Sequence, residues 1–144
     1  MGSNASFNVN EQEIIDKNKH KGCLVCGCKY TEVYHELPEG MKYNAPHSFK
    51  VIRTRTADEV AGWPDKILAE IHFQEGPIKE CGVNGVCNED LIAMVICRLE
   101  HFQKSEYSCR ENGFTITKLE EALMWLRKRT INREYRGVEG TNIK

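Results

Sequence analysis

The spacing of hydrophobic residues changes once along this chain, from a strand-like to a helix-like period near residue 87. Before that point, residues 31–37 and 48–54 are rich in β-branched and aromatic side chains, and turn-forming Pro, Gly and Asn separate them. Residues 66–73 alternate between apolar and polar, and residues 62–65 (GWPD) form the preceding turn. The alternation predicts a half-buried antiparallel strand whose apolar face carries Ile67, Ala69, Ile71 and Phe73.

Beyond residue 87, apolar residues recur at three- and four-residue intervals, which predicts a helix. Asn88 is a suitable N-cap, and Glu89 and Asp90 follow in the first turn, where the helix dipole favours negative charge. Residues 105–107 end this helix. Its apolar stripe consists of Leu91, Val95, Leu99 and Phe102.

A second helix is predicted by the capping box SCRE at residues 108–111, in which Ser108 caps the helix and Glu111 reaches back to it. The helix should end near Arg136, because Gly137 can adopt the left-handed conformation that closes many helices. Two helices joined by a short loop form an antiparallel hairpin. The apolar stripe of the second helix consists of Leu119, Ala122, Leu123 and Leu126.

Together these elements predict the α+β class, with a small antiparallel β-sheet followed by a C-terminal antiparallel α-helical hairpin. A length of 144 residues allows one modest core. We divide the chain into a flexible N-terminal segment (1–20, in part a cloning remnant), an antiparallel β region (21–86), the helical hairpin (87–137) and a C-terminal tail (138–144).

The composition is that of a globular protein, with 40% hydrophobic and 28% charged residues. No apolar run reaches the roughly 18 residues of a membrane helix and no secretory signal is evident, so we expect a cytoplasmic protein without a membrane partner. A net charge of −1 argues against binding to long nucleic acids. A local basic cluster, which suits a small anion, is formed by Arg127, Lys128, Arg129, Arg133 and Arg136.

The seven cysteines are an odd number, which fits a reducing compartment better than a complete disulfide framework. Cys23, Cys26 and Cys28 have the spacing of a zinc knuckle and have histidines nearby. A structural zinc site needs four ligands, and a second C-x-x-C is missing. We therefore expect reduced cysteines in a surface turn, with no metal and no cofactor, and keep zinc as the alternative.

The sequence contains no nucleophile elbow, glycine-rich phosphate loop or H-E-x-x-H motif, so we expect no enzymatic activity. Arg129 and Arg133 are four residues apart and share one helix face. They form either a diphosphate clamp or a solvated helix end that complements the dipole, exposed in both cases. Arg110 indicates an anion site, because the dipole does not select a cation in the first turn of a helix.

Five segments of the chain, in order and at matching spacing, resemble the Thoeris anti-defense sponge family of phages. That family shares its C-terminal hairpin with the anti-CBASS nucleotide sponges. The segments are FQEGPIKE (73–80), GVNG (82–85), CREN (109–112), TKLEEAL (117–123) and RGVEGT (136–141). The resemblance implies a protein that sequesters glycocyclic ADP-ribose in the host bacterial cytoplasm without cleaving it, and binds CBASS cyclic oligonucleotides in a separate site.

The resemblance also implies roles for single residues. Phe102 and Arg129 would stack on the adenine of glycocyclic ADP-ribose, and Asn112 and Arg133 would take its polar or phosphate groups. Arg110 falls where the family holds cyclic trinucleotides at a three-fold assembly. For Phe102, which continues the apolar stripe of its helix, a purely structural role is the alternative.

The spacing of these residues has a consequence for assembly. Arg133 follows Asn112 by 21 residues, which is about 31 Å along a helix. A shared ligand therefore requires two subunits packed antiparallel, so we expect a homo-oligomer, a dimer at least or a hexamer built as a trimer of dimers. The rival functions are a phosphodiesterase that degrades the same signals and a small zinc-stabilised interaction or DNA-binding module.

Overall fold

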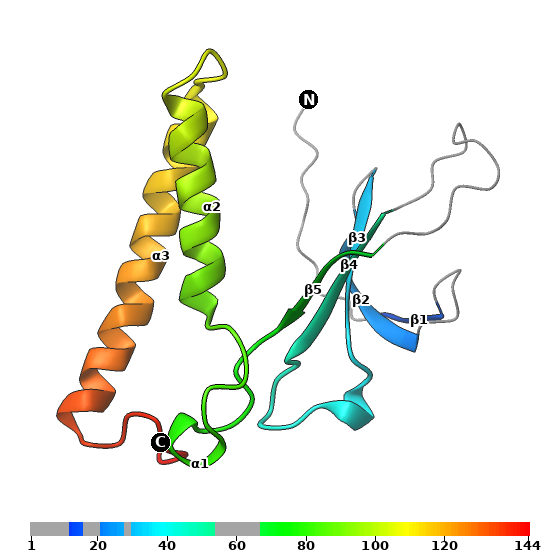
Figure 1. The fold of residues 1–144 in the computed structure, drawn as a ribbon, viewed down its shortest axis with the longest axis vertical. Helices are drawn as coiled ribbons and strands as arrows, with labels where there is room; N and C mark the ends of the chain where they lie inside the picture. Colours follow the sequence, from blue (N-terminus) through cyan, green and yellow to red (C-terminus); the bar gives the residue numbers. More distant parts are fainter. Residues whose placement is uncertain (1–11, 16–20, 28–29, 54–66) are drawn as a thin grey trace. The chain divides into compact units, whose positions relative to one another are not determined.

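The computed structural model describes residues 12–15, 21–27, 30–53 and 67–144, and the structural statements below concern these residues. The chain divides into two compact units, Met1–His72 and Phe73–Lys144, and each is described by itself. The first holds an antiparallel sheet and the second the helices, which confirms the predicted α+β class (Figure 1). The turn expected at residues 62–65 lies outside the described residues.

The sheet is a meander in which each strand pairs antiparallel with the next one along the chain. The strands are β1 (Gln12–Ile15), β2 (Lys21–Gly27), β3 (Thr31–His35), β4 (Ser48–Arg53) and β5 (Ile67–His72). The last three confirm the strands predicted from sequence. In β5, Ala69 and Ile71 are half-buried while Glu70 and His72 are exposed, as the alternation predicted, but Ile67, expected on the apolar face, is exposed at the start of the strand.

The strands β1 and β2 were not predicted, and the surface turn expected around the first cysteines was wrong. Cys23 and Cys26 lie within β2, where Cys23 pairs with His35 of β3 and Cys26 with Val33. The apolar residues between the two cysteines favour a pleated strand, and pairing on both sides satisfies the backbone of β2. Cys28 lies outside the described residues.

The sheet unit contains the buried residues of the described chain. Tyr34 and Ile52 on neighbouring strands are 8% and 6% exposed, and His35, next to Tyr34, is 4% exposed. After β3, the Glu36 carboxylate accepts backbone hydrogen bonds from His47 (2.7 Å) and Ser48 (2.8 Å), closing the long connection to β4. Burial alone would raise the pKa of Glu36, but these hydrogen bonds favour the charged form and the net shift is downward.

Residues 73–86, grouped with the β region by the sequence analysis, belong to the hairpin unit. They fold into a compact loop around the short helix α1 (Ile78–Cys81), closed by a parallel bridge between Phe73 and Val86. Inside the loop, the backbone N–H of Asn84 donates to Gln74 Oε1 (3.0 Å), and the side-chain amide of Asn84 donates to the Glu75 carbonyl (2.7 Å). These non-local amide contacts explain why the segment folds as a unit although its sequence resembles a plain glycine-rich connector.

The predicted hairpin consists of α2 (Asn88–Gln103) and α3 (Arg110–Tyr135), which run side by side in opposite directions (Figure 1). The N-cap of α2 is Cys87 rather than the predicted Asn88. The cause is Asp90, whose carboxylate accepts the backbone N–H of Cys87 at 2.7 Å and so starts the helix one residue earlier. Burial, followed by repulsion from Asp90 and Glu89, raises the pKa of the Cys87 thiol.

The predicted capping box at Ser108 was also wrong. The N-cap of α3 is Cys109, without a side-chain cap of its own. Its backbone is held by Gln103 at the end of α2, whose side chain accepts the Cys109 N–H and donates to the Cys109 carbonyl, each at 2.9 Å. A side chain from the preceding helix therefore replaces the local capping box and ties the two helices together at the turn.

The end of α3 confirms the sequence prediction. Arg136 is the C-cap and Gly137 has a φ of 70°, the left-handed conformation expected there. The Gly137 N–H donates to Glu134 O (2.9 Å) and the Val138 N–H to Arg133 O (3.0 Å), which is the pattern of a Schellman motif.

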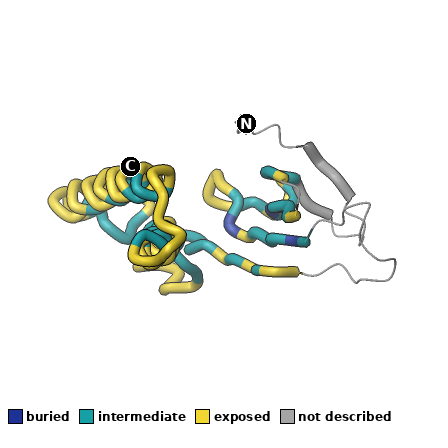
Figure 2. Tube along the Cα trace, turned by 90° about the horizontal axis from the view of Figure 1, so that it is seen from above, coloured by how far each residue is buried: buried dark blue, intermediate teal, exposed yellow. Residues whose placement is uncertain are grey.

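Most residues of the hairpin are exposed or half-buried (Figure 2), and several of the exposed ones are large and apolar. No residue of α2 or α3 is fully buried. On α3, the residues that face α2 are half-buried, and large apolar side chains also lie on the exposed positions. The exposed large apolar residues of the two helices are Met94, Val95, Phe114, Met124, Trp125, Ile131 and Tyr135.

Candidate functional site

The turn end of the hairpin gathers an aromatic pair and an arginine around Phe102. The guanidinium of Arg98, one helical turn earlier on α2, lies over the Phe102 ring at 5.1 Å from its centroid. Tyr107 in the turn stands edge-on to the same ring, with centroids 6.4 Å apart and an interplanar angle of 89°. Pockets that bind small ligands typically measure about 300–1,000 Å³. Here the pocket measures about 450 Å³ and is lined by Arg98, His101, Phe102, Ser105 and Tyr107.

The first turns of α3 carry a second cation–aromatic pair beside this pocket. The Arg110 guanidinium lies over the Phe114 ring at 4.9 Å from its centroid, and both residues are exposed. Asn112, half-buried, lies between them in the sequence at the third position of the helix. The structure therefore brings Phe102, Arg110 and Asn112 to the same end of the hairpin. Two hydrogen bonds between the Gln103 side chain and the Cys109 backbone fix the short turn that connects their helices.

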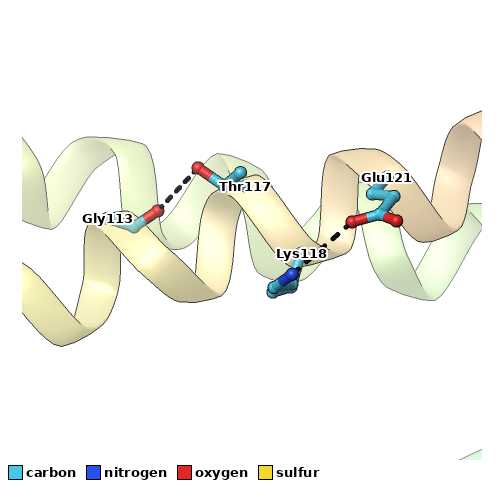
Figure 3. Close-up of polar contacts among 4 residues, drawn as sticks. All are labelled: Gly113, Thr117, Lys118 and Glu121. Carbon is cyan, nitrogen blue, oxygen red and sulfur yellow. Dashed lines mark hydrogen bonds and ion pairs between the residues drawn. The ribbon is translucent and has the colours of Figure 1, made fainter.

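The N-terminal half of α3 contains local polar contacts (Figure 3). Thr117 Oγ1 donates to the Gly113 carbonyl at 3.1 Å, and Lys118 Nζ lies 3.7 Å from Glu121 Oε2. These four residues line neither of the two pockets described at the ends of the hairpin.

The opposite end of α3 forms an open pocket of about 380 Å³ on one face of the helix. Four of its residues are cationic, and Lys128 Nζ lies over the Trp125 ring at 5.0 Å. Multiple cations with an amide and an aromatic ring form a suitable environment for a phosphorylated, base-containing ligand. The pocket is lined by Trp125, Lys128, Arg129, Asn132, Arg133 and Arg136.

The two arginines singled out by the sequence differ in their contacts. Arg129 is exposed and makes no hydrogen bond or ion pair within the described part of the chain. Arg133, which we expected on an exposed face, is half-buried. Its guanidinium donates to the carbonyls of Ile143 (2.9 Å), Val138 (3.1 Å) and Thr141 (2.9 Å), because the chain folds back after Gly137.

The five candidate residues therefore fall into two groups on one hairpin. Phe102, Asn112 and Arg110 lie at the turn, and Arg129 and Arg133 share the pocket near the C-terminal end of α3. Sequence reasoning overlooked Arg98, Trp125 and Asn132 as pocket residues. Their spacing of three or four residues from the candidates, which places them on the same helix faces, was the available signal.

No group of three or more His, Cys, Asp or Glu side chains is placed to hold a metal ion among the described residues. No helix in the described part of the chain combines the length and hydrophobicity that a membrane span needs.

Comparison with known proteins gives two findings. Residues 65–130 match the family model described as Acb2/Tad1, hairpin domain. A curated phage protein, Thoeris anti-defense 1 of Bacillus phage SBSphiJ7, is 50% identical to this chain over 135 residues, which cover 81% of this chain and 92% of the relative. The second match extends beyond the hairpin and includes much of the sheet unit.

Proposed function

Because this chain belongs to the Thoeris anti-defense 1 family of phage proteins, we propose that it is a sponge for cyclic nucleotide signals of host immunity. It is a phage anti-defense protein. In the proposed mechanism it binds glycocyclic ADP-ribose, the signal of Thoeris, in the host bacterial cytoplasm and holds it intact. A sponge competes with the host effector by affinity, and nanomolar binding corresponds to about −12 kcal/mol.

The observation that carries the proposal is the division of suitable chemistry between the two ends of the hairpin. The turn end offers the face of Phe102 for stacking and the Asn112 amide for polar groups. The other end offers four cations in one pocket, with Arg129 exposed and Arg133 half-buried. An adenine nucleotide with two phosphates needs both kinds of group.

The distance between the two ends supports a site shared by two subunits. A span of about 31 Å along α3 is too long for one small nucleotide. Two hairpins packed antiparallel would bring Phe102 and Asn112 of one subunit to Arg129 and Arg133 of the other, and two-fold symmetry would create two identical sites. The apolar surface on the outer face of α3 suits such packing, as a dimer or as a trimer of dimers.

A second anion site is proposed at Arg110. Its guanidinium lies over Phe114 and remains exposed at the first turn of α3. Three such pairs around a three-fold axis would present three cations to a cyclic trinucleotide, one to each phosphate. We place it apart from the first site because the Arg110 guanidinium lies over Phe114, whereas the first site uses Phe102 and Asn112.

The residues proposed to contact the ligands are suited to binding rather than to chemistry; they are Phe102, Arg110, Asn112, Arg129 and Arg133. Arginine stays protonated and cannot serve as a general base, and the aromatic rings and amides supply stacking and hydrogen bonds. We therefore propose capture without catalysis, with no cofactor.

Calorimetric titration with a panel of glycocyclic ADP-ribose isomers and cyclic oligonucleotides tests the proposal. We expect tight binding of a glycocyclic ADP-ribose and recovery of the intact ligand by chromatography after the complex is heat-denatured. Recovery of a cleaved product, in amounts that grow with incubation, would instead identify a phosphodiesterase. An absence of binding across the whole panel would contradict the sponge proposal.

A further inference from the structure

Arg133 is held by the backbone of the C-terminal segment, residues 138–143, and this arrangement limits how it can bind a ligand. One Nη1 hydrogen is donated to the Ile143 carbonyl at 2.9 Å. Nη2 donates to two carbonyls, Val138 at 3.1 Å and Thr141 at 2.9 Å. Three carbonyl oxygens from one short segment therefore surround a single guanidinium.

The count of donors determines what remains for a ligand. A guanidinium has five N–H groups, of which Nη2 carries two. A guanidinium can donate two parallel hydrogen bonds to a phosphate in two ways, from Nε and Nη2 or from Nη1 and Nη2, and both ways use one Nη2 hydrogen. With both Nη2 hydrogens donated to the segment, Arg133 retains the Nε hydrogen and one Nη1 hydrogen, which point in different directions.

The segment that holds Arg133 is itself fixed on several sides. The Val138 carbonyl also accepts hydrogen bonds from the Thr141 N–H (3.1 Å) and the Thr141 hydroxyl (2.6 Å). The Gly140 carbonyl accepts the Lys79 N–H at 3.0 Å, and a Cβ on Gly140 would lie 3.1 Å from the Lys79 side chain. The carbonyl cradle is therefore anchored to α1 as well as to the end of α3.

We propose that residues 138–143, and the Thr141 hydroxyl in particular, are a positioning element for ligand capture. The segment fixes the guanidinium of Arg133 before the ligand arrives, so that little side-chain entropy is lost on binding. Arg133 then acts as an oriented single hydrogen-bond donor and fixed charge, and not as a two-point clamp. This inference rests on the proposed function only in placing Arg133 in the ligand site.

Matched substitutions at Thr141 test the positioning role. Thr141→Val keeps the shape of the side chain but removes the hydroxyl, which donates to the Val138 carbonyl at 2.6 Å and accepts the Ile143 N–H at 3.4 Å; Thr141→Ser keeps both bonds. We expect Thr141→Val to weaken glycocyclic ADP-ribose binding by roughly three- to tenfold, mainly through the loss of the shorter bond, and Thr141→Ser to stay close to wild type. Thr117→Val, which removes a threonine hydroxyl bond to a backbone carbonyl elsewhere on α3, is the control.

A double-mutant cycle separates positioning from general stability. In an Arg133→Ala background, Thr141→Val should cause no further loss of affinity, because its effect passes through Arg133. An equal loss in both backgrounds would overturn the proposal, as would wild-type affinity in Thr141→Val. Thermal melts establish that each variant is folded at the temperature of the titration.

Side-chain nitrogen NMR of Arg133 in the unsubstituted protein gives a test that needs no variant. We expect slowed rotation of the Arg133 Nη groups in the free protein, and the same hydrogen-bonded state after ligand is added. Release of the Nη2 bonds on ligand binding would overturn the proposal by showing that the ligand displaces the segment. Ordered Arg133 signals in a protein that binds no member of the panel would contradict the proposed function while leaving the cradle itself intact.

Discussion

The two ends of the hairpin carry different chemistry on the same pair of helices. At the turn, each of two arginines lies over an aromatic ring, Arg98 over Phe102 and Arg110 over Phe114. At the other end, four cations share one pocket, and Arg133 among them is tied to the backbone of the C-terminal segment. Phe102 and Asn112 lie at one end and Arg129 and Arg133 at the other, so a site that uses all four residues, as proposed above, requires two chains.

The largest effect is expected from disrupting assembly itself. The double substitution Met124→Lys with Ile131→Lys places charges on the apolar outer face of α3, where these residues are 56% and 47% exposed. We expect a folded monomer by light scattering and complete loss of glycocyclic ADP-ribose binding, because each hairpin keeps only half a site. Val83→Lys, at a position that is 80% exposed in the loop before α2, should change neither property. A folded monomer that still binds the ligand would contradict the proposal that two chains complete the site.

Alanine substitutions of the two arginines in the cationic pocket should weaken ligand binding to a similar extent but differ in their effect on protein stability. Arg129→Ala and Arg133→Ala should each reduce affinity by about ten- to a hundredfold, the effect of a lost charge-assisted hydrogen bond. Arg133→Ala should also lower the free energy of unfolding by about 1–3 kcal/mol, since three hydrogen bonds to the backbone are lost. Arg133→Lys should recover only part of the affinity, because one ammonium cannot span three carbonyls.

Titration beside a thermal melt for each variant checks this pair. Equal melting temperatures for Arg129→Ala and Arg133→Ala would mean that the contacts of Arg133 add nothing to stability. Affinities within threefold of wild type in both variants would show that the two arginines do not contribute to ligand binding and only form a solvated helix end.

The turn end should itself divide into two functions. Arg110→Ala is expected to abolish binding of cyclic trinucleotides while leaving glycocyclic ADP-ribose binding within about twofold of wild type. The reason is that Arg110 faces the Phe114 side of α3 and the proposed glycocyclic ADP-ribose site uses Phe102 and Asn112. Parallel calorimetric titrations with both ligands make the measurement. If this one substitution removed both binding activities while the fold was preserved, the two ligands would share one site and the proposal of separate sites would be wrong.

The smallest effect is expected from the Gln103 hydrogen bonds at the turn. Gln103→Ala removes both hydrogen bonds to Cys109 and should lower the free energy of unfolding by about 1 kcal/mol, measured by urea denaturation. Ser108→Ala is the matched control, because Ser108 is the residue of the predicted capping box that does not cap the helix. A larger loss from Ser108→Ala than from Gln103→Ala would contradict the observed arrangement of the turn.

The hairpin could be predicted from sequence because its signals are local. Three- and four-residue spacing of apolar side chains and the glycine at position 137 determine where the helices run and where α3 ends. The helix starts were each misplaced by one residue. At α2, the Asp90 carboxylate extends the helix to a Cys87 cap, and at α3 the cap is supplied by Gln103 from six residues earlier.

The features that could not be predicted depend on contacts between distant residues. Glycine and cysteine weaken the alternating pattern in β2, and β1 lies in the segment predicted to be flexible; in both cases pairing with a neighbouring strand outweighs the local preference. Arg133 was correctly placed on its helix face, but its three carbonyl partners exist only after the chain folds back beyond Gly137. Local spacing predicts which side chains share a helix face but not which of them already have partners.

Mixing two defective variants tests most directly whether the site is shared between subunits. Phe102→Ala breaks the turn half and Arg129→Ala the cationic half, so each variant alone should bind glycocyclic ADP-ribose weakly. When the two are co-expressed with different tags, half of the dimers formed at random are mixed, and each mixed dimer regains one intact site. We expect about a quarter of the wild-type number of high-affinity sites, from two-fold symmetry. Titration of the co-expressed sample that finds no high-affinity sites, despite mixed oligomers shown by both tags, would contradict a site built from two chains.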